Sequence, residues 1–174
     1  MKKIILLLLV LIISPVNAQV LTGEVKYTID DARIELQNNR PNAIDYMLAQ
    51  NNFVDKERNA NYFALLKGKT NLNDRMLALF SDGSYAINYK NDLKHVWYYD
   101  KDGTLINIEV RTSLEFPYGS YKYDCDGTLV NMSLKVSKDE TFIFSPLGEL
   151  LGHWIGDNCY DENGDIVMTR KIMK

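Results

Sequence analysis

Histidine and cysteine are both scarce in this chain, which has two of each among 174 residues. His95 and His153 lie far apart in the sequence, and neither Cys125 nor Cys159 has a histidine beside it. The chain also lacks a Gly-x-Ser-x-Gly elbow, a phosphate-binding glycine loop and a His-Glu-x-x-His helix. An enzymatic hypothesis therefore has no mechanism to start from, and we predict no catalytic residue, no metal site and no cofactor.

An excess of positive charge is also missing, since the formal net charge is −3 at pH 7. A mildly acidic chain has no electrostatic footprint for nucleic acid or for an anionic lipid surface. Both are excluded as expected partners, and an unidentified protein or glycan is left.

Long apolar runs are absent after the first residues of the chain. Lys2 and Lys3 precede an apolar stretch from Ile4 to Ile13, and Val16-Asn17-Ala18 fits the site that a signal peptidase reads. The stretch is half as long as the roughly twenty residues of a membrane-spanning helix. We therefore predict a signal peptide, residues 1–18, cleaved after Ala18. Because residue 19 is Gln and not Cys, no lipid attachment is expected there, and the product is predicted to be periplasmic or secreted with no membrane insertion.

The two cysteines leave two interpretations open. In an oxidising compartment Cys125 and Cys159 can form a disulfide, and the alternative is two unpaired thiols packed as small apolar residues. Their spacing fits no zinc pattern.

An internal repeat is the most informative feature of the sequence. Four segments share an aromatic residue, then Asp or Ser, two variable residues, Gly, one residue, and Leu or Ile: Tyr99–Leu105, Tyr123–Leu129, Phe144–Leu150 and Tyr160–Ile166. A fifth, shortened copy is Phe80–Tyr85.

The repeat has the residues of a hairpin turn. An Asp or Ser at the first turn position accepts backbone hydrogen bonds, and Gly at the last takes the positive φ of a type I turn with a bulge. The predicted turn residues are Asp100, Gly103, Asp124, Gly127, Gly148, Asp161 and Gly164. Aromatic residues two apart before three of the turns, such as Tyr121 and Tyr123, indicate strands. Since both residues after each Gly-x step are apolar, we expect both faces of the sheet to be covered.

The predicted fold is α+β: one or two short N-terminal helices followed by a long antiparallel β-meander of hairpin repeats. Apolar spacing predicts helices over residues 23–38 and 42–50, although 24–29 is also compatible with a strand, and Asn38–Pro41 would end the first helix. Residues 51–61 are polar and read as a linker. Strands begin near Tyr62. We thus expect a helical segment at 19–60 and a β-repeat region at 61–174, packed as one domain.

The segment Tyr121–Leu129 resembles a YD repeat of the Rhs type, Tyr-x-Tyr-Asp-x-x-Gly-x-Leu, and MORN-like repeats are also similar. The resemblance covers residues 95–170. The residue after each Gly departs from the basic residue common in YD repeats. The resemblance implies a structural or interaction role outside the cell and no reaction.

Three candidate functions follow. The first is an exported noncatalytic repeat protein, whose Trp97, Tyr99, Tyr121 and Tyr123 would form an aromatic binding face if they are exposed; we favour the alternative that these rings are the core of the sheet. The second is a small periplasmic hydrolase using His95 or His153. The third is a calcium-stabilised adhesive module, although the Asp-rich turns do not match the EF-hand ligand pattern.

Overall fold

The computed structural model describes residues 27–41, 72 and 74–173, and these form one α-helix and ten β-strands. The helix is α1 (Ile29–Asn38). The strands are β1 (Arg75–Phe80), β2 (Tyr85–Tyr89), β3 (Asp92–Tyr99), β4 (Leu105–Arg111), β5 (Tyr118–Tyr123), β6 (Leu129–Lys135), β7 (Glu140–Phe144), β8 (Leu150–Ile155), β9 (Asn158–Tyr160) and β10 (Ile166–Met173).

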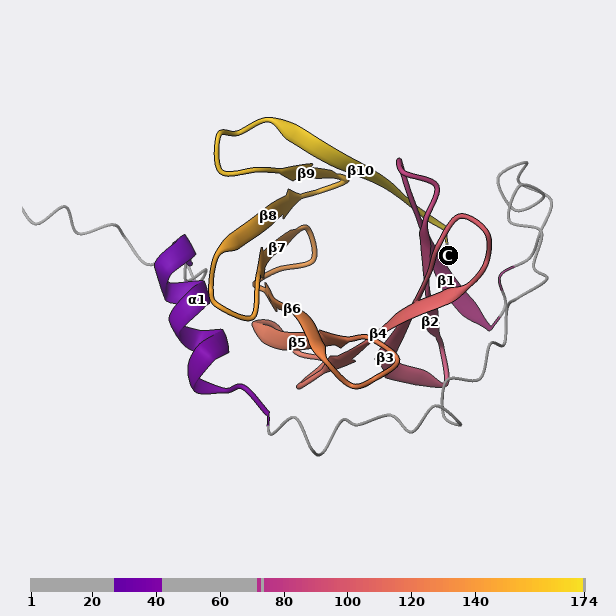
Figure 1. The fold of residues 1–174 in the computed structure, drawn as a ribbon, viewed down its shortest axis with the longest axis horizontal. Helices are drawn as coiled ribbons and strands as arrows, with labels where there is room; N and C mark the ends of the chain where they lie inside the picture. The colour runs from indigo at the N-terminus through magenta and orange to yellow at the C-terminus, as the bar shows by residue number, and fades with distance from the viewer. Residues whose placement is uncertain (1–26, 42–71, 73, 174) are drawn as a thin grey trace, which may run out of the picture.

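Each strand pairs antiparallel with the next one along the chain, and β1 also pairs with β10, so that the sheet closes into a barrel (Figure 1). The closing pairs run from Leu77 opposite Met173 to Phe80 opposite Arg170. The β-rich fold and the antiparallel order are as predicted, but the sheet is closed where an open meander was expected. Closure gives the two terminal strands partners for their backbone groups, which an open sheet would leave unpaired.

The repeated glycines are turn residues, as the sequence predicts. Gly103 has a φ of 86°, and its N–H donates to the carbonyl of Asp100, while the Asp100 N–H donates to the carbonyl of Thr104. The same pair of bonds closes the turns at Gly127, Gly148 and Gly164, and Gly83 closes the shortened fifth copy. Register shifts follow four of these turns, those at Gly103, Gly127, Gly148 and Gly164, as the bulge in this turn type requires.

Helix α1 packs on the outside of the barrel, beside β6 and β7 (Figure 1). Thr28 and Asp31 form a capping box at its start, which satisfies two backbone N–H groups. Leu36 is buried, and its carbonyl accepts a bond of 2.9 Å from the Tyr121 hydroxyl. The helix ends at Asn38, the predicted end, but it begins at Ile29 and not at residue 23, since Tyr27 and Thr28 are not helical. Expectations for a second helix over 42–50, a linker at 51–61 and a strand from Tyr62 fall outside the described residues.

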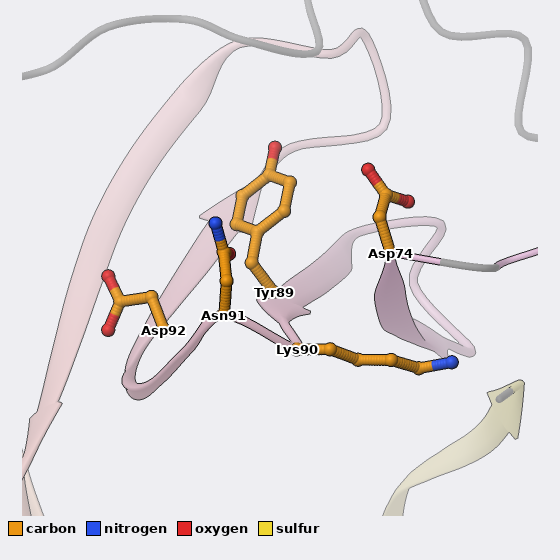
Figure 2. A pocket seen from close by; sticks show the side chains of 5 residues that line it. All are labelled: Asp74, Tyr89, Lys90, Asn91 and Asp92. Atoms are coloured by element: carbon orange, nitrogen blue, oxygen red, sulfur yellow. The ribbon is translucent and has the colours of Figure 1, made fainter.

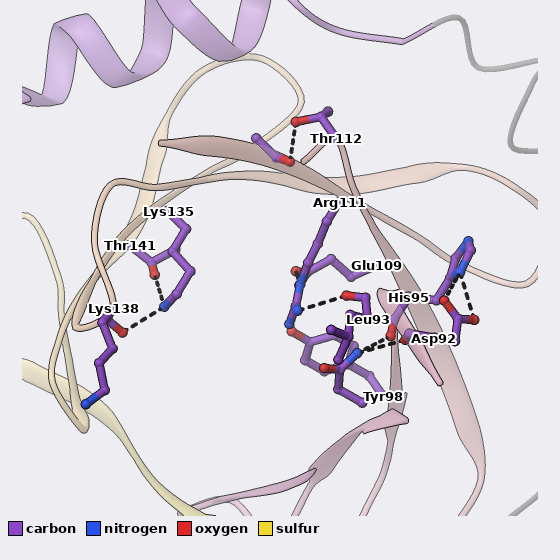
Figure 3. A network of polar contacts seen from close by, with 12 residues as sticks. Asp92, Leu93, His95, Tyr98, Glu109, Arg111, Thr112, Lys135, Lys138 and Thr141 are labelled. Atoms are coloured by element: carbon purple, nitrogen blue, oxygen red, sulfur yellow. Dashed lines mark hydrogen bonds and ion pairs between the residues drawn. The ribbon is translucent and has the colours of Figure 1, made fainter. Parts of the chain in front are cut away.

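Because α1 lies on the outside with Tyr121, the side chains that alternate with Tyr121 along β5 point into the barrel. The outward set is apolar and buried: Leu77, Tyr85, Ile87, Trp97, Tyr99, Ile108, Tyr121, Tyr123, Met132, Leu134, Phe142 and Phe144. The inward set includes Tyr98, Glu109, Arg111 and Lys135, which project into the ring in Figure 3. The main apolar core thus lies on the outer face of the barrel wall.

Cover on the outer face stops near the turns, which departs there from the expectation that both faces of the sheet are covered. The second of the two apolar residues after each Gly-x step is at least 38% exposed in each copy: Ile106, Val130, Leu151 and Val167. None of the helices in the described part of the chain has the length and apolar character needed to cross a membrane.

Candidate functional site

The five repeated turns lie at one end of the barrel. Neighbouring strands run in opposite directions, so every connection from an odd-numbered strand to the next strand leaves from the same end. These connections are the turns at 81–84, 100–104, 124–128, 145–149 and 161–165. We call this end the repeat rim. Sequence reasoning identified each turn, and the antiparallel order that it predicted already places them along one edge of the sheet; it missed the closure, which arranges them as a ring.

The repeat rim is acidic. Its five turns carry nine carboxylates and one lysine, whereas the four connections at the other end carry three carboxylates and two lysines. The rim carboxylates are Asp82, Asp100, Asp102, Asp124, Asp126, Glu149, Asp161, Glu162 and Asp165. A ring of one charge sign attracts surfaces of the opposite sign.

The rim carboxylates divide into two groups by their hydrogen bonds. The side chain of Asp124 accepts from the N–H groups of Asp126 and Thr128, and Asp100 and Asp161 hold their own turns in the same way. Backbone donors, that of Asp165 first, lower the pKa of Asp161. The exposed side chains of Asp102 and Asp126 have no such bond among the described contacts, and they are the groups that the rim presents to solvent.

Exposed aliphatic side chains border the acidic tips. Ile106, Val130, Leu151 and Val167 follow four of the turns on the outer face, and Leu147 at the tip of the fourth is 84% exposed. Apolar residues beside a charged ring are typical of protein interaction surfaces. The sequence contains these side chains as pairs of apolar residues after each turn. The pairs were interpreted as evidence that both faces of the sheet are covered, and not as an exposed apolar border.

The four aromatic residues that the sequence suggested as a binding face are buried, so they form no exposed surface. Trp97 is 8% exposed, Tyr99 is fully buried, and Tyr121 and Tyr123 are each 1% exposed. These rings lie on the outer face that α1 helps to cover, and Tyr99 stacks on Tyr85 at 4.9 Å between ring centroids. The alternative favoured from the sequence, that the rings are core, describes this structure.

The cysteines are unpaired. Cys125 is exposed at the tip of the turn between β5 and β6, whereas Cys159 is buried on β9, and several strands separate them. The Sγ of Cys159 lies against Gly152 on the neighbouring strand β8, at 2.6 Å from where a Cβ on Gly152 would stand. Burial raises the pKa of the Cys159 thiol, so it is an apolar filler rather than a reactive group.

The two histidines lie on opposite sides of the barrel. His95 on β3 and His153 on β8 are five strands apart in either direction around the ring, so they do not share one site. Each is paired with one acid: His95 Nδ1 lies 2.9 Å from Asp92, and His153 Nε2 lies 2.9 Å from Glu140. No serine, threonine or cysteine side chain bonds either ring among the described contacts.

A polar pocket of about 530 Å³ lies beside the turn between β2 and β3, lined by Asp74, Tyr89, Lys90, Asn91 and Asp92. Figure 2 shows the two carboxylates on opposite sides of Tyr89. Asp74 is held by Arg75 through two bonds of 2.8 Å, and this pairing lowers the pKa of Asp74. The two acids therefore do not form the close carboxylate pair that general acid–base catalysis uses.

Comparison of the chain with protein-family models, with curated proteins and with solved structures returns no match. The likeness to YD and MORN-like repeats thus remains a prediction made from the turn motif.

Proposed function

We propose that this protein is an exported, noncatalytic interaction module that presents its repeat rim to a partner with a basic surface at the bacterial envelope or outside the cell. The observation that carries the proposal is the gathering of five acidic turns at one end of the barrel. The export part rests on the signal-peptide pattern of residues 1–18.

The neighbouring side chains favour a protein partner over a glycan. The exposed groups at the rim are acidic and aliphatic, whereas sugars are usually held by exposed aromatic rings, and the rings here are buried. A protein surface with lysines or arginines around an apolar patch complements both features of the rim.

The test compares two charge-matched variants in capture from fractionated envelope and secreted proteins. Asp102→Asn/Asp126→Asn removes two exposed rim carboxylates, and Glu115→Gln/Asp139→Asn removes two at the other end of the barrel. We expect the rim variant to lose most of its capture, by about tenfold in affinity, and the control to retain it. Equal capture by both variants, or none by the parent chain, would contradict the proposal.

The runner-up is a hydrolase centred on His95. Its support is the bond between His95 and Asp92 beside the 530 Å³ pocket, because a carboxylate that orients a histidine is part of many hydrolytic sites. The matching test is a panel of ester, amide and phosphoester substrates. Turnover that is lost in His95→Gln and kept in His153→Gln would support this alternative.

A further inference from the structure

Four cationic side chains face the inside of the barrel, in a chain that is acidic overall. They are Arg111 on β4, Lys122 on β5, Lys135 on β6 and Arg170 on β10. Arg111 and Lys135 point into the ring in Figure 3. Lys122 lies 3.5 Å from the centroid of the Tyr98 ring, and the Arg170 guanidinium lies 4.5 Å from that of Trp154.

Anionic groups inside the barrel are fewer than these cations. Glu109 is the inward carboxylate among the described residues; it accepts a bond from Tyr98, and its oxygen is 3.9 Å from Arg111 Nε. Asp157, in the connection between β8 and β9, places a carboxylate oxygen 3.8 Å from the Nε of Arg170. Lysines and arginines are rarely buried unless they are paired. The cationic excess therefore costs stability unless something else offsets it.

Repulsion among these cations adds to the effect of burial on the pKa of Lys135. Burial first, and then the charges of Arg170 and Arg111, lower its pKa from the usual 10.5 to about 8, against the opposing pull of Glu109 and Asp139. The Nζ of Lys135 also donates to the carbonyl of Lys138 and, at 3.4 Å, to the hydroxyl of Thr141. Burial likewise lowers the pKa of Lys122.

Two of the cations still have donor capacity. The Nε atoms of Arg111 and Arg170 are buried and have no hydrogen-bond acceptor among the described residues. Yet the side chains of Arg111 and Arg170 are 20% and 15% exposed, so solvent reaches part of the interior. Each Nε lies near a carboxylate, Glu109 at 3.9 Å and Asp157 at 3.8 Å, but beyond hydrogen-bond distance, so its N–H can still donate to an acceptor from outside the chain.

We propose that the barrel interior binds a small organic anion, whose carboxylate or phosphate group is held by Arg111, Lys135 and Arg170. The aromatic side chains among these cations, Tyr98, Tyr118 and Trp154, supply flat apolar walls for the body of the ligand. This proposal is independent of the one made for the repeat rim.

The charge distribution also sets the direction of entry. The acidic repeat rim repels anions from one end of the barrel. Arg111 and Lys135 are the last residues of β4 and β6, which end at the opposite opening. The anion therefore enters at the end that carries the connection between β4 and β5.

The test is calorimetric titration of the mature protein with benzoate and with benzamide, its neutral analogue of nearly the same shape. We expect benzoate to bind at least about tenfold more tightly than benzamide. Lys135→Gln and Arg170→Gln should each weaken benzoate binding by about tenfold, and Lys171→Gln, which removes an outward lysine from β10, should leave it unchanged. Competition by inorganic phosphate distinguishes a phosphate-binding site from one selective for carboxylate, and either result agrees with the proposal.

A second measurement uses the parent chain alone, in case the variants fold poorly. Benzoate binding should weaken between about pH 7 and about pH 9, because Lys135 loses its proton in that range. Equal affinity for benzamide and benzoate, the same loss in Lys171→Gln as in Lys135→Gln, or no binding of any of these compounds would overturn the proposal. None of these results bears on capture by the repeat rim.

Discussion

Tyr98 donates a hydrogen bond of 2.7 Å to Glu109 inside the barrel, and Lys122 lies over the ring of the same tyrosine. Burial, and then the charge of Glu109, raise the pKa of Tyr98 well above 10.0. The tyrosine thus stays a neutral donor at physiological pH and links the inward carboxylate to one of the inward cations.

Replacing Tyr98 with Phe removes this donor and leaves a partly buried carboxylate oxygen unsatisfied. We expect Tyr98→Phe to lower the free energy of unfolding by about 1–2 kcal/mol, because hydrogen bonds to charged groups are among the stronger ones. Urea denaturation measures the difference. Tyr160→Phe is the control, since the bond that the Tyr160 hydroxyl makes among the described contacts is a long one, accepted from the Asn158 amide at 3.5 Å. Equal losses in both variants would contradict the assigned role.

Lys135 is predicted to destabilise the folded chain at neutral pH. Its folded pKa lies below the unfolded value, so between about pH 8 and pH 10.5 the unfolded state holds more of the proton and stability from this group rises with pH. Lys135→Met should therefore raise the free energy of unfolding at pH 7, by ~1 kcal/mol. The gain over the parent chain should shrink at about pH 9.5. Urea denaturation at the two pH values, with Lys171→Met as the control, measures it; a gain that is independent of pH would be inconsistent with this origin.

Asp124 stabilises its turn through two backbone N–H groups, at 3.0 and 2.9 Å. Asp124→Ala should cost about 1 kcal/mol. Asp126→Ala, two residues on at the exposed tip, should change stability by less than ~0.5 kcal/mol. Thermal and urea unfolding of the pair separate turn chemistry from net charge, since both variants lose one negative charge. A larger cost for Asp126→Ala would show that the turn is held differently.

Gly152 and Cys159 are coupled by close packing between β8 and β9. A methyl group on Gly152 would meet the Cys159 Sγ at 2.6 Å, so Gly152→Ala should cost about 1–3 kcal/mol through overpacking. In a Cys159→Ala background the same substitution should cost at least ~0.5 kcal/mol less. A double-mutant cycle in urea measures this coupling. Strictly additive costs would mean that the two side chains do not contact.

Calcium should leave the melting temperature unchanged. The carboxylates of Asp100, Asp124 and Asp161 are already engaged by backbone N–H groups of their own turns. Melting curves in millimolar calcium and in chelator are the measurement. An upward shift with calcium would instead support the calcium-stabilised adhesive module, because a ligand that binds only the folded state raises stability.

Local sequence chemistry determined most of the secondary structure. The turn at Gly103 follows from an Asp that bonds its own backbone and a Gly that tolerates positive φ, and both requirements act within five residues. The end of α1 at Asn38 follows from an equally local pattern, the segment Asn38–Pro41.

Only the tertiary structure decided that the sheet closes and which face lies inside. Alternation along β5 separates Tyr121 from Lys122 but does not say which of them points into the barrel, because a closed sheet can bury either face. Helix α1, packed outside against Tyr121, settles the choice, and the pairing of β1 with β10 places the cations of β4, β6 and β10 around one interior. Both are contacts between residues far apart in sequence, so no short pattern records them.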